Sequence, residues 1–173
     1  MSKDRQPPEL DRRRFLICST AATLGLGVLD LGRHAWAAPS PPQIRRVQRL
    51  GRTGLEISDI SFGSGNVSDP DLVRYALDRG VNYFDTAERY EDGGAEKAIG
   101  EALQGKRDQV FLASKAKAES NTSRAEIMES LEASLRRLRT DHLDVFFNHA
   151  VNEVARLQND EWFEFADRAK PVS

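Results

Sequence analysis

Cysteine is nearly absent from this sequence, and so is any excess of positive charge. The one cysteine among the 173 residues is Cys18. It lies in an N-terminal segment that we expect to be removed, so the mature chain would hold neither a disulfide nor a thiolate metal site. The net charge is −2, and no basic patch is interleaved with aromatic residues. Nucleic acid is therefore not an expected partner.

A long apolar run is also missing. The most apolar stretch, residues 15–32, consists largely of Ala, Gly, Leu and Thr and is interrupted by Asp30. It is too weakly hydrophobic to form a stable membrane span. An arginine pair directly precedes it in the segment DRRRFL, and Ala35-Trp36-Ala37 follows it with the small residues of a cleavage site. This order is similar to that of a twin-arginine export signal.

The signal divides the chain into three parts. We expect a removable signal at residues 1–37, a proline-rich linker at 38–44 and the folded part at 45–173. The twin-arginine route exports folded proteins, so a periplasmic or other extracytoplasmic location is expected.

In the folded part, short apolar runs alternate with segments of helical periodicity. Residues 45–57 predict a hairpin around the turn Gly51-Arg52-Thr53-Gly54. Strands are predicted at four later places: 57–62, 81–84, 109–114 and 143–148. Because parallel strands need crossover connections, four successive strand–helix units predict a parallel α/β sheet. Periodicity does not decide between half of an eight-stranded barrel and a small doubly wound sheet.

The helices between these strands carry recognisable start signals. Ser68 or Asp69 can cap the first, with Pro70 at its first position, and Ser123-x-x-Glu126 is a capping box for the third. The second begins near Gly94, and a last helix carries Trp162, Phe165 and Ala169 on one side. The predicted apolar faces of the first three helices are Leu72, Val73, Ala76 and Leu77; Ala95, Ala98, Ile99, Ala102 and Leu103; and Ile127, Leu131, Leu135 and Leu138.

Reactive side chains follow three of the predicted strands. Asp85 follows the second strand, with Tyr90 five residues later, Lys115 follows the third, and His149 follows the fourth. In parallel α/β folds, reacting groups lie at the carboxyl ends of strands, so we expect these four side chains to meet at one rim. Each alone has an ordinary structural explanation, but their positions at successive strand ends favour a site.

An acid, a phenol, an ammonium and an imidazole together suit carbonyl reduction. The carbonyl oxygen gains negative charge as hydride reaches its carbon, and it needs a proton donor. A free tyrosine, with a pKa of about 10, is a slow donor, and a nearby ammonium favours its phenolate form. A carboxylate holds the ammonium, and an imidazole can bind and orient the substrate oxygen.

Three other chemistries are disfavoured by the same residues. Gly63-Ser64-Gly65 imitates a dinucleotide fingerprint, but Ser68 replaces its third glycine. A Schiff-base role for Lys115 needs a depressed lysine pKa, which a neighbouring Asp85 would raise. A metal site at His142, Asp144 and His149 is weak because residues five apart on a strand point to opposite faces.

Several of these segments resemble the aldo-keto reductase family. The similar segments are Leu50-Gly51-Arg52-Thr53-Gly54-Leu55, Phe62-Gly63, Phe84-Asp85-Thr86-Ala87 with Tyr90, Ser114-Lys115, and Asp144-Val145-Phe146-Phe147-Asn148-His149. The resemblance implies an eight-stranded (β/α) TIM-type barrel closed at its base by a hairpin. It also implies NADP(H)-dependent reduction of small aldehydes or ketones. Tyr90 would be the general acid, Lys115 and Asp85 would tune it, and His149 would orient the carbonyl.

Only the first four of the eight expected strand–helix units are present in this sequence. The later strand ends, which hold most of the cofactor contacts in the family, are missing, so no cofactor-binding residue is assigned. A half barrel leaves two strand edges and its inner face uncovered. We therefore expect the isolated chain to be marginally stable, to self-associate through its open edges, and to be of doubtful activity alone. The alternative is a non-enzymatic binding module with a remnant site.

Overall fold

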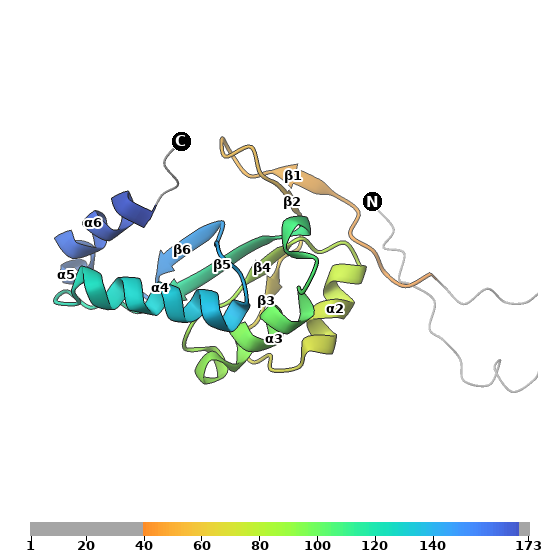
Figure 1. Ribbon diagram of the computed structural model, residues 1–173. Coiled ribbons are helices and arrows are strands. Elements are labelled where there is room, and N and C mark those ends of the chain that lie inside the picture. Colours follow the sequence, from red (N-terminus) through yellow and green to blue (C-terminus); the bar gives the residue numbers. More distant parts are fainter. Residues whose placement is uncertain (1–39, 170–173) are drawn as a thin grey trace, which may run out of the picture. The chain divides into compact units, whose positions relative to one another are not determined.

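A four-stranded parallel sheet is the frame of the folded part. We analysed a computed structural model that describes residues 40–169. Its strands β3 (Phe62–Gly63), β4 (Tyr83–Asp85), β5 (Phe111–Ala116) and β6 (Val145–Asn148) pair in chain order, each parallel to the next (Figure 1). The expected export signal and the first two residues of the linker lie outside the described residues.

The strand order decides between the two predicted architectures. A doubly wound sheet reverses its strand order at a switch point and carries helices on both faces. Here the order runs without reversal, and helices α2 (Pro70–Asp78), α3 (Gly94–Ala102) and α4 (Arg124–Leu138) pack in one cluster with a single face of the sheet. The prediction of a partial barrel is confirmed.

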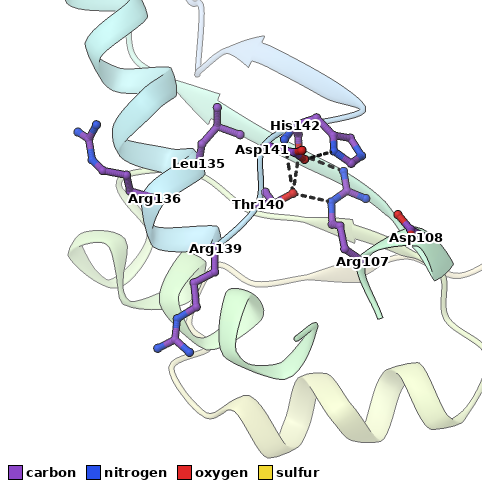
Figure 2. Close-up of a pocket in the computed structure, with 8 residues that line it drawn as sticks. All are labelled: Arg107, Asp108, Leu135, Arg136, Arg139, Thr140, Asp141 and His142. Atoms are coloured by element: carbon purple, nitrogen blue, oxygen red, sulfur yellow. Dashed lines mark hydrogen bonds and ion pairs between the residues drawn. The ribbon is translucent and has the colours of Figure 1, made fainter. Parts of the chain in front are cut away.

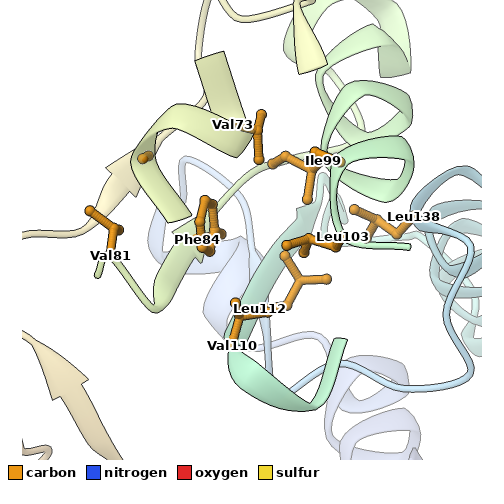
Figure 3. Close-up of a cluster of buried hydrophobic side chains, with 10 residues drawn as sticks. Val73, Val81, Phe84, Ile99, Leu103, Val110, Leu112 and Leu138 are labelled. Atoms are coloured by element: carbon orange, nitrogen blue, oxygen red, sulfur yellow. The ribbon is translucent and has the colours of Figure 1, made fainter. Parts of the chain in front are cut away.

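The main hydrophobic core lies between that face and the helices. Because side chains alternate along a strand, Phe84 of β4 and Leu112 of β5 point into this layer while their neighbours point away. The buried members of the cluster are Val73, Ala76, Val81, Phe84, Ile99, Ala102, Leu103, Val110, Leu112 and Leu138 (Figure 3). All members of this cluster are apolar.

The predicted helix starts are confirmed, with one error in a helix face. Asp69 caps α2 by accepting from the Asp71 N–H, and Pro70 occupies the first position. Ser123 and Glu126 form the predicted reciprocal capping box at the start of α4. Leu72, however, is exposed, because the buried face of α2 turns about Val73 and Ala76.

The N-terminal hairpin is present, but the prediction of a strand at 57–62 is wrong. Strands β1 (Val47–Arg49) and β2 (Glu56–Ser58) pair antiparallel around the predicted turn. The chain then bends, because the Ser58 hydroxyl donates to the Ile60 carbonyl, and β3 is a separate short strand. Asn82, just before β4, accepts from the Ser58 N–H and donates to the Glu56 carbonyl, which attaches the hairpin to the amino end of the sheet.

A second, smaller core lies where the last helices meet the sheet. Helices α5 (Val154–Leu157) and α6 (Asp160–Ala169) follow β6. Phe165 of α6 is buried against Ile127 and Ala118, and Trp162 stacks on Phe146 with ring centroids 6.1 Å apart. The predicted side for Trp162 and Phe165 is therefore confirmed.

The opposite face of the sheet has no helix on it in the described part of the chain. Strands β3 and β6 each have one neighbour there, as the half barrel requires. Phe147 of β6, which belongs to this inner face, is 43% exposed. Among residues 40–169, none of the helices combines the length and apolar character needed to cross a membrane.

Candidate active site

The four predicted side chains meet at the carboxyl end of the sheet. Asp85 is the last residue of β4, Lys115 is the fifth of the six residues of β5, and His149 comes directly after β6. Tyr90 opens the short 3-10 helix η2 (Tyr90–Gly93) that leads into α3. Alternation places Asp85, Lys115 and His149 on the inner face, away from the helix-covered core.

Lys115 and Asp85 form the closest pair of the site. The Lys115 ammonium donates to Asp85 Oδ1 at 2.5 Å and to the Thr86 carbonyl at 2.8 Å. Their side chains are 15% and 30% exposed, so the pair is partly shielded from water. Two acceptors, one at the end of β4 and one directly after it, thus hold a cation that comes from β5 and fix where its charge lies.

The Tyr90 ring lies close to both this cation and the imidazole. Lys115 Nζ is 5.0 Å from the centre of the Tyr90 ring. The His149 ring meets Tyr90 edge to face, with centroids 5.5 Å apart and planes at 86°. Such an arrangement is favourable for aromatic pairs and holds both rings in one orientation.

The turn that presents Tyr90 has an unusual backbone. Glu91 and Asp92, the two residues after Tyr90, have φ values of 51° and 50°. These left-handed conformations are costly for residues with a side chain and concentrate at functional sites. The Tyr90 N–H donates to the Ala87 carbonyl, which closes the turn on its other side.

The surroundings of His149 favour its neutral form. Burial lowers its pKa below the ordinary value, and the charges of Lys115 and Arg89 lower that pKa further against the opposing effect of Asp85 and Glu88. Its Nδ1 is buried and has no hydrogen-bond partner among the described residues. At neutral pH the imidazole can therefore donate one hydrogen bond to a neutral oxygen without carrying a charge of its own.

Two polar groups beside the site escaped the sequence analysis. Asn148 Oδ1 accepts from the Ala118 N–H and from Arg156, and Arg156 of α5 is only 3% exposed. Asn148 was visible as part of a predicted strand and of a segment with a family resemblance, but neither gave it a role. Arg156 follows no strand and belongs to no recognisable pattern, so no signal in the sequence marked it.

A buried carboxylate on the other face of the sheet was missed as well. Glu96 of α3 is fully buried, accepts from the Ser114 hydroxyl at 2.6 Å and pairs with Arg137 Nε at 2.5 Å. Arg137 in turn contacts the Ser134 hydroxyl. These groups join α3, β5 and α4, so their role is structural.

A hollow lies away from the site, at the amino ends of β5 and β6. It has a volume of about 510 Å³, and its lining includes three arginines (Figure 2). Arg107 is committed to the Thr140 hydroxyl, the His142 carbonyl and Asp144. Arg136 and Arg139 point away from the other labelled side chains (Figure 2), so these cations do not converge on a ligand.

No metal cluster is found in the described part of the chain: residues 40–169 contain no group of three or more His, Cys, Asp or Glu side chains placed to hold an ion.

The sheet order, the hairpin and the inner-face site define a protein of the (β/α)8-barrel class. The sequence profile of the aldo/keto reductase family matches residues 63–166, more than half of the chain. The chain belongs to the aldo/keto reductase family.

Named relatives agree with this assignment. The chain is 48% identical over 77 residues to methylglyoxal reductase YeaE of Escherichia coli, covering 44% of this chain and 27% of that protein. It is 35% identical over 120 residues to aldo-keto reductase YhdN of Bacillus subtilis, covering 58% of this chain and 36% of that protein. The chain therefore spans well under half the length of these curated relatives.

Solved structures show the same fold. The crystal structure of an aldo-keto reductase from Klebsiella pneumoniae in complex with NADPH superposes with a TM-score of 0.57 at 31% identity. The match covers 68% of this chain and 44% of that one. The strands described here thus correspond to part of an aldo-keto reductase barrel.

Proposed function

We propose that this chain supplies the proton-donating side of an NADP(H)-dependent carbonyl reductase. The observation that carries the proposal is the convergence of Asp85, Tyr90, Lys115 and His149 at one rim, with the Lys115 ammonium 5.0 Å from the Tyr90 ring. NADPH, when bound, supplies hydride to the carbonyl carbon and leaves as NADP⁺.

Each side chain then has one task. Tyr90 gives its phenolic proton to the carbonyl oxygen, so that one hydride and one proton complete the alcohol. Lys115 stabilises the negative charge left on the phenol oxygen, and Asp85 keeps the ammonium in place. The neutral His149 imidazole donates a hydrogen bond to the substrate oxygen and orients it.

The chemistry of this donor set fits the cofactor that the family implies. The rim offers a proton donor and a hydrogen-bond donor for the oxygen of a carbonyl whose carbon accepts hydride. The unpartnered, buried Nδ1 of His149 marks a polar group that the described residues leave unsatisfied. The four rim residues would border the reactive end of the cofactor, and we assign no residue to its phosphates.

The substrate class that we propose is a small aldehyde or ketone. One relative is named a methylglyoxal reductase, which makes methylglyoxal a reasonable first probe. The test combines NADPH binding, measured by nicotinamide fluorescence, with oxidation of NADPH in the presence of methylglyoxal. Replacement Tyr90→Phe should reduce turnover at least 100-fold, because the proton donor is lost while the ring stays. Tyr75→Phe on the exposed side of α2 is the matched control, and a Tyr90→Phe enzyme with normal turnover would contradict the assignment.

Assembly and export complete the proposal. Open edges at β3 and β6 and the half-exposed Phe147 favour association of two copies. Light scattering on the protein eluting from gel filtration would measure this association, and a stable monomer would contradict it.

The arginine pair and the cleavage site at residues 35–37 support twin-arginine export. Substitution of Arg12, Arg13 and Arg14 by lysine should leave an uncleaved precursor in the cytoplasm, and normal processing would contradict the route.

A further inference from the structure

Arg156 of α5 is a buried arginine that donates most of its hydrogen bonds to residues 148–150, around His149. Its Nη2 donates to the His149 carbonyl at 2.9 Å and to Asn148 Oδ1 at 3.1 Å, and its Nη1 donates to the Ala150 carbonyl at 2.7 Å. Its Nε donates to the Ala118 carbonyl, in the loop after β5, at 2.9 Å. One guanidinium thus joins the loops that follow two neighbouring strands.

The partners of Arg156 differ from those of an ordinary ion pair. Three of its four hydrogen bonds go to backbone carbonyls. A carboxylate is also near: Glu119 Oε2 lies 3.2 Å from Arg156 Nε, but the Glu119 side chain is 46% exposed. The guanidinium itself is only 3% exposed. A planar group with five donors in a rigid fork can fix several carbonyls at once in a set geometry, whereas a lysine has three rotatable donors on one atom.

These contacts anchor the backbone on both sides of the imidazole. The His149 N–H donates to the Ala116 carbonyl of β5 at 2.8 Å, while its own carbonyl is held by Arg156. The next residue, Ala150, has a φ of 49°, a costly conformation for alanine that needs outside support. The guanidinium supplies that support through the Ala150 carbonyl, so only the side-chain torsions of His149 remain free.

We propose that Arg156 is a positioning residue that holds the His149 imidazole edge to face against Tyr90. It touches neither substrate nor cofactor and acts through the Asn148 side chain and the backbone of His149 and Ala150. This inference rests on the proposed function for its catalytic consequence, but its structural core can be tested without turnover.

The first test is NMR of the imidazole protons in the full chain. The chain contains three histidines, His34, His142 and His149, so a His149→Gln variant assigns the signal. In the unmodified chain the Tyr90 ring should displace the chemical shifts of the His149 imidazole protons, and Tyr90→Leu should abolish this displacement. Arg156→Met should abolish it as well, and should have no further effect in the Tyr90→Leu background. Arg136→Met, at an exposed arginine of α4, is the control and should leave the signals unchanged.

A second variant keeps the test decisive if Arg156→Met does not fold. Arg156→Lys retains the positive charge beside Glu119 but loses the fork, and it should weaken the displacement in a chain of normal thermal stability. The proposal would be overturned if Arg156→Met or Arg156→Lys folds and still gives the His149 signals of the unmodified chain.

Turnover then separates positioning from general packing. With NADPH and methylglyoxal, Arg156→Lys should lower kcat about 10- to 100-fold with NADPH affinity unchanged, since a small misplacement of an orienting group has effects of that size. A uniform loss of NADPH binding with kcat preserved would contradict the inference. If Tyr90→Phe leaves turnover normal while Arg156 variants still shift the imidazole, the proposed chemistry is wrong and the positioning role stands.

Discussion

The two faces of the parallel sheet are formed by the same strands but have different roles. On the helix-covered face, Phe84 and Leu112 are fully buried in a close-packed layer. On the inner face, one residue after Phe84 and three residues after Leu112, Asp85 and Lys115 keep part of their surface in contact with solvent. Packing on the first face fixes the strands, and the strands then fix the charges on the second.

The comparison shows that polar pairs on the two faces have different energetic roles. Glu96, on the covered side, is fully buried and satisfied by Ser114 and Arg137. The Asp85–Lys115 pair has similar geometry but partial exposure, which leaves room for a substrate. The first pair serves stability, whereas we propose that the second serves chemistry at the rim.

The largest expected effect comes from breaking the buried pair. Glu96→Gln should destabilise the chain by about 3 kcal/mol, because it leaves Arg137 without its compensating charge. Urea unfolding followed by circular dichroism measures the change. The matched control is Glu101→Gln, whose exposed pair with Arg74 should contribute far less, because solvent screens it. Equal effects at the two positions would refute this view of Glu96.

An effect of similar size contrasts apolar side chains of the two faces. Leu112→Ala should cost about 3 kcal/mol, the range for removing a fully buried leucine. Phe147→Ala should cost about 1 kcal/mol or less in the monomeric chain, since Phe147 is 43% exposed. The same unfolding experiment compares them at low concentration. A large loss for Phe147→Ala would show that another surface covers the inner face, as in the proposed association.

A smaller effect tests the electrostatics of the site through His149. Lys115→Met should raise the pKa of His149, because a lowering charge is removed, and Asp85→Asn should lower it, because a raising charge is removed. NMR titration of the imidazole gives both values. Shifts of the same sign in the two variants would contradict the arrangement described here.

The smallest effect concerns stability at mildly acidic pH. The pKa of His149 is lower in the folded chain than its ordinary value of about 6.5, so the unfolded state binds this proton first as the pH falls. The contribution of His149 to the unfolding free energy is therefore fully present above a pH of about 6.5. It declines as the pH falls from there to the pKa of the folded state. Replacement by glutamine should make the unfolding free energy less dependent on pH in that window. An unchanged slope would mean that His149 titrates normally.

Local signals in the sequence predicted much of this architecture. Pro70 after Asp69, the capping box at Ser123, and the alternation of strand and helix patterns each act over a few residues, and all were confirmed. The bend after Ser58 was missed because it depends on the Ser58–Ile60 hydrogen bond and on Asn82, which lies 24 residues further along the chain.

The candidate site also contains residues that local signals predicted and residues that only distant contacts explain. The positions of Asp85, Lys115 and His149 followed from strand ends, since parallel strands bring their carboxyl ends together. Arg156 could not be predicted, because its acceptors are backbone carbonyls brought near it only by the tertiary fold. The burial of Glu96 likewise depends on Arg137, 41 positions away.

The adjacency of Ser114 and Lys115 on β5 has a consequence for how this strand can change during evolution. Ser114 donates to the buried Glu96 on one face, and Lys115 donates to Asp85 on the other. Loss or gain of one residue within β5 would turn the ammonium toward the apolar layer and the hydroxyl toward the rim. Substitutions along β5 can therefore be tolerated one at a time, whereas single-residue insertions and deletions should be excluded from it, and length changes should accumulate in the loops before and after the strand.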